Sequence, residues 1–308
     1  RQDLEIFFNL TGKVVQPIFD TQIAAMVCGY GEQIGYENLV RQITGAGMDK
    51  SSQYTNWSHR PLTQKQLDYA LGDVTHLIDI YHALAKTLHE RERTHWVIEE
   101  EAILGNPQTY HVNPEESWER VKIKSPKPKT LAVLRALAAW REQRAQDKNI
   151  PRNWVMRDET LADMAAQAPK DVQSLQKIRN MSADMAEGKL GQQLLSIIEK
   201  AVKSDPNTWP QVKKHKPPSA KITAIVEVLR MLLKIKAAKH EVAAKLIATS
   251  EELEEIAKYA SMEPTDEIAP LHGWRYEVFG KKALELKNGE IAIALKNGKI
   301  DMIDIKEK

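Results

Sequence analysis

The stretch 62–92, LTQKQLDYALGDVTHLIDIYHALAKTLHERE, is the feature that most constrains what this chain can fold into. Its apolar side chains recur at steps of three and four residues, which predicts one long amphipathic helix. The apolar positions are Leu67, Ala70, Leu71, Val74, Leu77, Ile78, Tyr81 and Leu84. Thr63 is the expected N-cap, and Gln66 would complete a capping box with it. The fold must therefore bury one side of a long helix.

Two residues of this helix carry a possible chemistry. Tyr69 and Asp73 stand four residues apart, which places them on one face, about 6 Å apart along the axis. A carboxylate can hold a divalent metal ion, and a phenol one turn away can orient the water that such an ion makes nucleophilic. A helix of this length also offers such pairs by chance. The alternative is a tyrosine at the edge of the core and a solvated aspartate.

The length and the cysteine content set the broad class. A chain of 308 residues suggests two or three domains with ample core. Its single cysteine, Cys28, excludes an intramolecular disulfide framework and a cysteine metal cluster, and it fits a reducing compartment. No apolar run approaches the roughly 18 residues of a membrane span, and no signal peptide is visible. We therefore expect a cytoplasmic protein without a membrane partner. The sequence identifies no protein partner.

The charge is unevenly distributed along the chain. Residues 1–112 carry 9 basic and 14 acidic side chains, residues 113–216 carry 20 and 13, and residues 217–308 carry 15 of each. A basic middle region would suit contact with polyanions, and an acidic first region would suit cation binding. The alternative is an ordinary solvated surface.

Residues 1–112 are predicted to form the later part of an α/β domain. The opening segment reads as a helix ending at Gly12, and residues 14–20 read as a short strand interrupted by Pro17. Asp20 is the expected N-cap of a second helix, and residues 36–45 form a third. Residues 46–61 have a loop-like composition and lead into the long helix.

Residues 113–130 are predicted to be a basic linker, followed by a small helical bundle over residues 131–203. Lys122 and Lys124 lie in the linker and could follow a phosphate backbone. In the bundle, Asp158 is the expected cap of one helix. Basic residues gather near its first connection, at Arg141, Arg144, Lys148, Arg152 and Arg157. Trp154 beside them could stack on a base, although core packing is the favoured interpretation.

The rest of the chain is predicted to hold a second linker over residues 204–219, a second helical module over residues 220–282 and a β-hairpin tail over residues 283–308. The second module weakly repeats the first at an offset near 92–93 residues. The tail carries Asn-Gly pairs at 288–289 and 297–298 between alternating apolar runs, which predicts a three-stranded meander with type I′ turns.

Several of these segments together resemble the bacterial ribonuclease D family. They are FDTQIAA (19–25), YENLV (36–40), MDKSSQYTNWSHRPLTQKQLDYALGDVTHL (48–77) and the two helical modules. The resemblance implies a ribonuclease-H-like 3′–5′ exonuclease domain with four acidic residues and a tyrosine, followed by HRDC-type domains that bind nucleic acid. The fold class expected is thus multidomain and mainly α. It would comprise a partial α/β exonuclease domain, two small all-α HRDC-type domains and a short C-terminal β-meander.

The resemblance also implies roles for individual residues. Asp3 would match the aspartate of the family's second motif, and Tyr69 with Asp73 would match its Tyr-x-x-x-Asp motif. Asp3 and Asp73 would then be ligands of two ions in the complete enzyme, with Mg²⁺ or Mn²⁺ expected because oxygen ligands favour hard cations. No Asp-x-Glu precedes Asp3. The N-terminal strands with half of the ligands are therefore expected to be missing, and this fragment is expected to lack activity by itself.

The implied substrate is RNA, in particular the 3′ ends of tRNA precursors. Lys50 and Arg60, in the loop before the long helix, could contact the RNA backbone, and Trp57 could stack on a base. The alternatives are a salt bridge for Arg60 and a buried plug for Trp57. Two other functions remain open at this point. They are a non-catalytic nucleic-acid-binding protein and a DNA-directed proofreading-type exonuclease.

Overall fold

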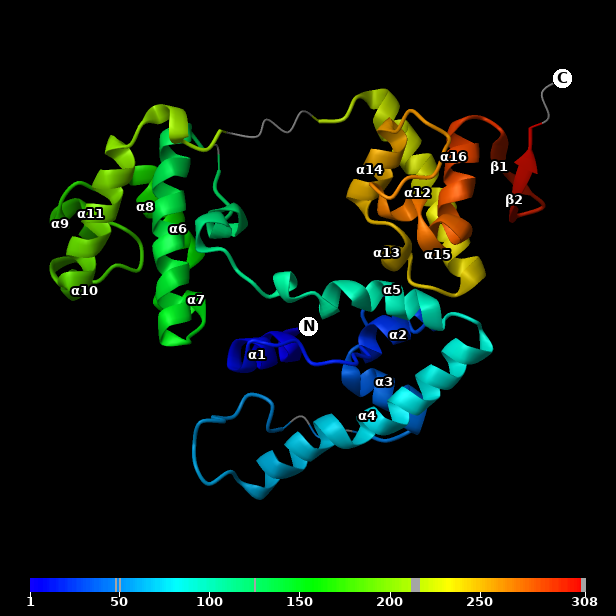
Figure 1. Ribbon diagram of the computed structural model, residues 1–308, viewed down its shortest axis with the longest axis horizontal. Coiled ribbons are helices and arrows are strands. Elements are labelled where there is room, and N and C mark those ends of the chain that lie inside the picture. Colours follow the sequence, from blue (N-terminus) through cyan, green and yellow to red (C-terminus); the bar gives the residue numbers. More distant parts are fainter. Residues whose placement is uncertain (48, 50, 125, 212–216, 306–308) are drawn as a thin grey trace. The chain divides into compact units, whose positions relative to one another are not determined.

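The computed structural model describes residues 1–47, 49, 51–124, 126–211 and 217–305, and it divides into two compact units (Figure 1). We call Arg1–Pro107 together with Pro217–Lys308 the split unit, and Gln108–Lys216 the middle unit. Each unit has its own cluster of buried hydrophobic side chains, and the two clusters share no residue. Within the described residues, no helix is long and apolar enough to cross a membrane.

The first part of the split unit is helical, and its helix ends carry the predicted caps. Asp20 accepts hydrogen bonds from the backbone of Gln22 and Ile23, and Thr63 and Gln66 form both bonds of the capping box. The first helix ends at Gly12, as predicted. The helices are α1 (Gln2–Thr11), α2 (Thr21–Val27), α3 (Tyr36–Thr44), α4 (Gln64–Glu90) and α5 (Thr94–Gly105).

The predicted strand at residues 14–20 is wrong, because the structure gives this segment no strand. An extended apolar run becomes a strand only when a neighbouring backbone pairs with it. Here the ring of Phe19 packs edge-on against Tyr81 of α4, with 4.8 Å between the ring centroids. The segment is therefore held by side-chain packing onto the long helix.

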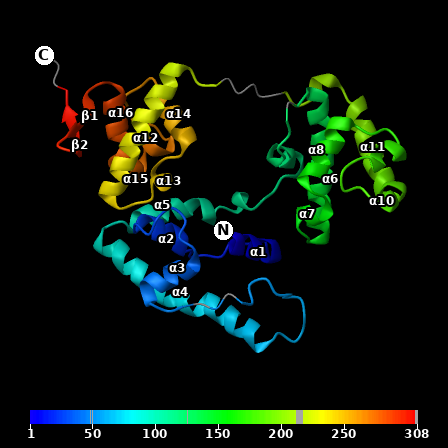
Figure 2. The same cartoon turned by 180° about the vertical axis from the view of Figure 1, so that it is seen from behind.

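The long helix α4 is buried over only part of its predicted apolar face. Figures 1 and 2 both show α2 and α3 beside it, and the buried contacts gather at its C-terminal half, where Ile80, Leu84 and Leu88 are at most 1% exposed. In the N-terminal half, Leu71 and Val74 are exposed. The predicted helix is confirmed, but its apolar pattern alone did not say which turns would be covered.

The second helical module belongs to the split unit and begins with the long helix α12. Its α12–α13 connection lies against α2, where the Ala243 N–H donates to the Met26 carbonyl at 3.1 Å and Glu241 forms an ion pair with Arg91 at 2.8 Å. The elements are α12 (Ala220–His240), α13 (Ala244–Ile247), α14 (Ser250–Lys258), η4 (Ala269–Leu271), α15 (Gly273–Arg275), the π-helical turn η5 (Tyr276–Gly280) and α16 (Lys281–Lys287).

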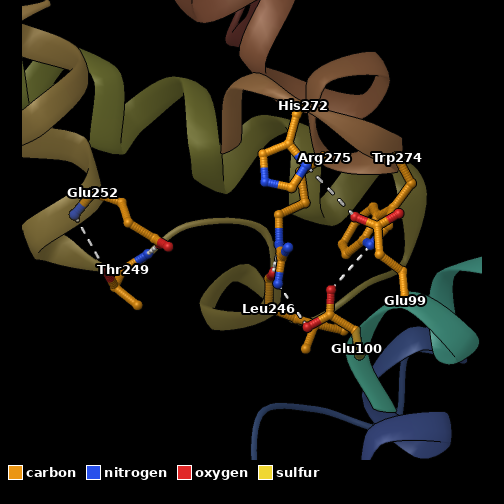
Figure 3. A network of polar contacts seen from close by, with 8 residues as sticks. All are labelled: Glu99, Glu100, Leu246, Thr249, Glu252, His272, Trp274 and Arg275. Atoms are coloured by element: carbon orange, nitrogen blue, oxygen red, sulfur yellow. Dashed lines mark hydrogen bonds and ion pairs between the residues drawn. The ribbon is translucent and has the colours of Figure 1, made fainter. Parts of the chain in front are cut away.

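A buried polar network joins this module to α5 (Figure 3). Glu100 accepts a hydrogen bond from Trp274 Nε1 at 3.1 Å and pairs with Arg275 Nη2 at 2.6 Å. Arg275 Nε donates to the Leu246 carbonyl at 2.8 Å, and the rings of Trp96 and Trp274 stack with centroids 4.4 Å apart. Burial raises the pKa of Glu100, and Arg275 and Trp274 partly offset this rise. The network fixes the second module on the first part of the chain.

The predicted three-stranded tail is wrong in its first strand. Residues 281–287 form α16, whose Ala283 and Leu284 are buried, and Gly289 (φ 81°) follows the helix end. An Asn-Gly pair can end a helix as well as turn a hairpin, because both need a left-handed residue. The second pair does turn a hairpin, since both its φ angles are positive between β1 (Ile291–Lys296) and β2 (Lys299–Asp304).

The middle unit packs η2 and several helices around α6. The stretch 113–130, expected to be an extended linker, instead begins with the 3₁₀ helix η2, which packs on α6 with Ser117 and Val121 buried. Because Val121 is buried in the core, this proline-rich segment is part of the folded module. The elements are η1 (Pro107–Thr109), η2 (Pro114–Arg120), α6 (Pro128–Lys148), α7 (Arg152–Val155), α8 (Asp158–Gln167), α9 (Val172–Gln176), α10 (Ala183–Glu187), α11 (Lys189–Lys203) and η3 (Pro206–Thr208). Residues 212–216 of the second expected linker lie outside the described residues.

The two helical modules repeat one another at an offset of 92 residues. Helices α6 and α12 begin at Pro128 and Ala220, and α7 and α13 begin at Arg152 and Ala244. Each long helix ends in a left-handed residue, Asn149 in the first and Glu241 in the second. The same backbone turn therefore occurs twice, with different side chains on it.

Candidate active site

The two functional candidates of α4 are in contact. The Tyr69 hydroxyl forms a side-chain hydrogen bond with the Asp73 carboxylate, and both side chains are half-buried. The rings of Trp57 and Tyr69 lie 5.8 Å apart between centroids, with their planes tilted by 53°. The four-residue spacing of a helix thus produces the expected pair, and the loop before α4 covers its tyrosine.

The surroundings of Asp73 disfavour a negative charge. Burial raises the pKa of this carboxyl, and the hydrogen bond from Tyr69 lowers it in part. Asp73 forms no ion pair with any side chain that the structure describes. A cation beside Asp73 would stabilise its ionised form.

Tyr36 is a third residue of this site, and the sequence analysis placed it in a helix without assigning it a role. Its hydroxyl donates to the Gly72 carbonyl at 3.1 Å, one residue before Asp73. Burial raises the pKa of Tyr36, and the charge of Asp73 raises it further. Tyr36 is the first residue of α3, so only the packing of α3 on α4 brings it to Asp73.

The loop before α4 is tied down by its own polar contacts. Gln66 Nε2 donates to Thr55 Oγ1 at 3.0 Å and to the Asn56 carbonyl at 3.3 Å, beyond its capping role. Arg60 Nη1 donates to the carbonyls of Trp57 and His59, at 2.8 and 2.9 Å, and remains exposed. Arg60 thus folds onto its own loop, and in the described part of the chain it makes no salt bridge. Lys50 lies outside the described residues.

The described residues supply only part of a metal site. Asp3 is exposed in the first turn of α1. Among the residues that the structure describes, no group of three or more His, Cys, Asp or Glu side chains lies close enough to hold an ion. A hard divalent cation fits the oxygen donors of Asp73 and Tyr69, but two ions need more carboxylates than these.

The predicted nucleic-acid contacts of the middle unit divide into two groups. Lys122 and Lys124 are exposed and Arg152 is half-exposed, which suits contact with a polyanion. Arg141 is 1% exposed and pairs with Asp158 at 2.6 Å. The prediction that Arg141 contacts phosphate is therefore wrong, because its guanidinium is buried and paired with Asp158 inside the module. The predicted capping role of Asp158 is also wrong. Its carboxylate pairs with Arg141, and α8 has no side-chain cap.

The favoured interpretation of Trp154 is also wrong. Its side chain is 78% exposed, whereas core packing had been expected. Helix α7 is a single turn, and Met156, directly after it, is the residue that enters the core. The periodicity of so short a helix is too brief to tell which side faces the interior.

Comparison with known proteins gives consistent results for both regions. A 3′–5′ exonuclease family model matches residues 1–89, and an HRDC domain model matches residues 130–198. Ribonuclease D of Bartonella henselae is 42% identical over 301 residues, which cover 98% of this chain and 73% of the relative. Ribonuclease D of Jannaschia sp. is 45% identical over 305 residues, which cover 99% and 78%. The crystal structure of Escherichia coli RNase D, an exoribonuclease involved in structured RNA processing, is similar with a TM-score of 0.74 at 25% identity, and the match covers 92% of this chain and 76% of that one.

Proposed function

This chain belongs to the ribonuclease D family of 3′–5′ exoribonucleases, and we propose that the complete enzyme trims the 3′ ends of structured RNA such as tRNA precursors. The exonuclease domain of this family is metal-dependent. The observation that carries the proposal for this chain is the hydrogen-bonded Tyr69–Asp73 pair on α4. A cytoplasmic location is the corresponding proposal, and a sequence with a single cysteine, Cys28, fits a reducing compartment.

In this proposal Asp73 is a metal ligand and Tyr69 is the residue that orients the attacking water. A bound divalent ion would supply charge neutralisation and a more acidic water. The Tyr69 hydroxyl forms a hydrogen bond with the Asp73 side chain, and its phenol oxygen can also accept a hydrogen bond from a water molecule. Tyr36 holds the backbone of Gly72 beside them and so positions that turn of α4.

The further metal assignments rest on the family motifs. We propose Asp3 as a second carboxylate ligand and Mg²⁺ or Mn²⁺ as the ions, two in the complete site. The chemistry of oxygen donors supports these ions, since soft thiolate and imidazole ligands are not among the assigned residues. The exposure of Asp3 leaves its carboxylate accessible to an ion.

For the RNA body we propose contacts with exposed basic side chains. These are Lys122, Lys124 and Arg152 in the middle unit, and Arg60 in the loop before α4. Lys50, which precedes Arg60 in the sequence, is proposed with them. Their role would be electrostatic and independent of sequence, because phosphate contacts position RNA without reading its bases. No group that reads a 2′-hydroxyl can be assigned from these residues, so preference for RNA over DNA rests on the family.

The proposal is tested by following the trimming of a 5′-labelled tRNA precursor, with Mg²⁺ or Mn²⁺, by the complete enzyme that carries the Asp-x-Glu of the family's first motif. We expect Asp73→Asn to lower the rate at least about 100-fold and Tyr69→Phe to lower it about 10- to 100-fold, because each removes a group that acts on the reacting water. The matched control is Asp79→Asn, an exposed aspartate of the same helix, which should trim at the parental rate. Binding of Mn²⁺, followed by its paramagnetic resonance signal, should weaken only in Asp73→Asn.

Two results would contradict the proposal in different ways. Equal trimming by Asp73→Asn and its parent would remove Asp73 from the site. Trimming of a single-stranded DNA 3′ end in preference to RNA would favour the DNA-directed exonuclease.

A further inference from the structure

We propose that Gln66 is a positioning residue of the active site, and that it holds the loop of residues 51–61 so that Trp57 lies against Tyr69. We call residues 51–61 the Trp57 loop. The inference rests on the proposed function, because it takes Tyr69 to be the residue that orients the attacking water. It goes beyond that function by assigning a role in the reaction to a side chain outside the Tyr69–Asp73 pair.

The first observation is the place of Gln66 on the long helix. It stands three residues before Tyr69, and Asp73 follows Tyr69 by four, so helical spacing puts all three side chains on one side of α4. Gln66 is only 5% exposed, whereas its neighbours Lys65 and Leu67 are exposed. A buried glutamine needs partners for its amide, because an unpaired polar group in the interior is costly.

The partners of Gln66 use the whole hydrogen-bonding capacity of its amide. Oε1 accepts from the Thr63 N–H at 3.0 Å and from Thr63 Oγ1 at 3.1 Å, as part of the capping box. Nε2 donates to Thr55 Oγ1 at 3.0 Å and to the Asn56 carbonyl at 3.3 Å. An amide has two acceptor sites and two donor hydrogens, so all four are used. One end of the side chain starts the helix, and the other holds the Trp57 loop.

The loop end of this network requires a donor. Thr55 Oγ1 gives its own proton to the Ser52 carbonyl at 2.8 Å, so toward Gln66 it acts as an acceptor. The Asn56 carbonyl is an acceptor by its chemistry. A carboxylate at this position would keep the contacts with Thr63, as the glutamate of a capping box does, but would set an oxygen against both loop acceptors. One substitution can therefore separate the two roles of the side chain.

The Trp57 loop carries an aromatic ring onto Tyr69. Trp57 directly follows Asn56, whose carbonyl Gln66 holds, and its half-buried ring lies 5.8 Å from the Tyr69 ring between centroids. On the other side of Trp57, Arg60 Nη1 donates to the Trp57 carbonyl at 2.8 Å. The backbone that carries the indole is thus held before and after it, and the hold before it comes from Gln66.

This support matters because the Tyr69 hydroxyl has to stay in one place. A phenol ring can turn about two side-chain bonds unless neighbours pack against it. Trp57 packs on the ring, and the hydroxyl forms its hydrogen bond with Asp73. A displacement of about 1 Å in a reacting group can slow a reaction about 100-fold. Release of the Trp57 loop should therefore lower kcat, whereas KM for the RNA should change little, because phosphate contacts elsewhere set it.

The kinetic test uses the complete enzyme and the tRNA precursor with Mg²⁺. We expect Gln66→Glu to lower kcat about tenfold and to keep KM within about twofold, although the capping box survives. Trp57→Leu should lower kcat by a similar factor. The double variant should be no slower than either single variant, because both changes remove the same contact. The matched control is Gln53→Glu, which adds the same charge at an exposed position of the Trp57 loop and should keep the parental kcat and KM.

A second readout does not depend on activity. In enzyme labelled with 5-fluorotryptophan, the Trp57 resonance is the one that is absent from the fluorine spectrum of Trp57→Phe. We expect Gln66→Glu and Tyr69→Leu each to move this resonance, because each takes the indole out of the ring current of Tyr69. Gln53→Glu should leave it in place. The other tryptophan resonances should stay where they are in all these variants, which shows that the fold is kept.

The failures of the inference and of the proposed function differ. Trimming by Gln66→Glu at the parental rate, or a Trp57 resonance that this variant leaves in place, would overturn the inference while the function stands. Additive losses in the double variant would overturn it as well, because Gln66 and Trp57 would then act separately. If the parental enzyme trims no RNA, the proposed function is wrong and the inference fails with it, whatever the fluorine spectrum shows.

Discussion

The two helical modules share a backbone but differ in what their first connection does. In the second module, residues 241–246 are engaged by the rest of the split unit, through Arg91, the Met26 carbonyl and Arg275. In the first module, the equivalent turn displays Trp154 to solvent and is fixed from within by Arg141. At the position of Arg141 the second module has Leu233, which is 6% exposed.

This difference shows two ways of holding the same backbone turn in place. A turn held from outside can dispense with an internal polar anchor, because its neighbours supply the hydrogen bonds. A turn without such neighbours needs its own anchor, and a buried guanidinium with two acceptors provides it. The comparison predicts that removing the outer contacts should affect the second module alone, and removing the inner anchor the first module alone.

The largest effect is expected from Glu100→Ala, which removes the outer contact of the second module. It leaves Arg275 buried without its partner and takes the acceptor from Trp274, so the free energy of unfolding should fall by about 3–5 kcal/mol. Urea denaturation followed by far-UV circular dichroism measures this loss. The control is Glu99→Ala. Its Oε1 has no hydrogen-bond partner among the described residues and lies 4.0 Å from His272 Nδ1, so its loss should cost less than about 1 kcal/mol. Equal costs for the two variants would show that the network does not hold the module.

A second prediction uses Cys28, which lies at the junction of α2 with the second module. Burial raises the pKa of its thiol from 9.0 to about 11, against the lowering effect of Arg91 and Arg93. The thiolate fraction at pH 8 should therefore be about 100-fold lower than for a free thiol, and labelling by a disulfide reagent should slow at least as much. The rate should rise about tenfold per pH unit up to about pH 11. Rapid labelling of the native protein at pH 8 would mean that the junction opens readily. If the junction is what protects Cys28, Glu100→Ala should speed its labelling.

Replacing the inner anchor tests the first module. Arg141→Leu, which introduces the residue of the second module, leaves the Met156 carbonyl without its donor and should cost about 2–3 kcal/mol. The loss is smaller than for Glu100 because Asp158 is 39% exposed and can be hydrated. Hydrogen exchange should show faster exchange of the amides of residues 154–156 and unchanged exchange in α12–α14. Unchanged protection of α7 would mean that the turn does not depend on Arg141.

Close backbone contact is tested by paired glycine substitutions. Gly29→Ala should destabilise by about 2–3 kcal/mol, because its φ is 90° and a Cβ would lie 2.7 Å from the Glu241 carbonyl oxygen. Gly31→Ala has a similar φ of 100° with open space around it, so it should cost only about 1–2 kcal/mol. The difference between their thermal midpoints measures the contact with the second module. Equal midpoints would show that only backbone strain acts at Gly29.

The smallest effect is expected at Trp154 and Leu246, which occupy the same position in the two modules. Trp154→Ala should change the free energy of unfolding by no more than about 0.5 kcal/mol, because its side chain is 78% exposed. Leu246→Ala should cost about 1–2 kcal/mol, because that side chain is half-buried. Denaturation curves of the two variants measure both values. A large loss for Trp154→Ala would assign the indole to packing.

Much of the fold followed from local sequence patterns. The caps at Asp20 and Thr63 were predicted because a side chain and a backbone N–H two or three residues later satisfy one another without help from the rest of the chain. The same holds for the turn at Asn297–Gly298, which needs two left-handed residues. The pair of Tyr69 and Asp73 was predictable for a related reason, since helical spacing alone brings them into contact.

Other features depended on contacts between distant segments. Tyr36 reaches Asp73 only because α3 packs on α4, and the Phe19 segment avoids the strand state because α4 offers its ring a partner. Residues 283–287 met the pattern of a strand, yet they form a helix whose Ala283 and Leu284 fill the interior of the split unit. Burial of these side chains outweighs a strand preference that is worth about 1 kcal/mol.

The sequence by itself determined the family, the long helix with its Tyr69–Asp73 pair, and the order of two related helical modules. Tertiary structure decided which arginine is buried and which tryptophan is exposed. Arg141 and Trp154 belong to types whose ordinary positions are the reverse of those found here. Their placement depends on whether hydrogen-bond acceptors and apolar neighbours from other turns meet the side chain. That information lies in the packing of the module and not in the residues next to them in the chain.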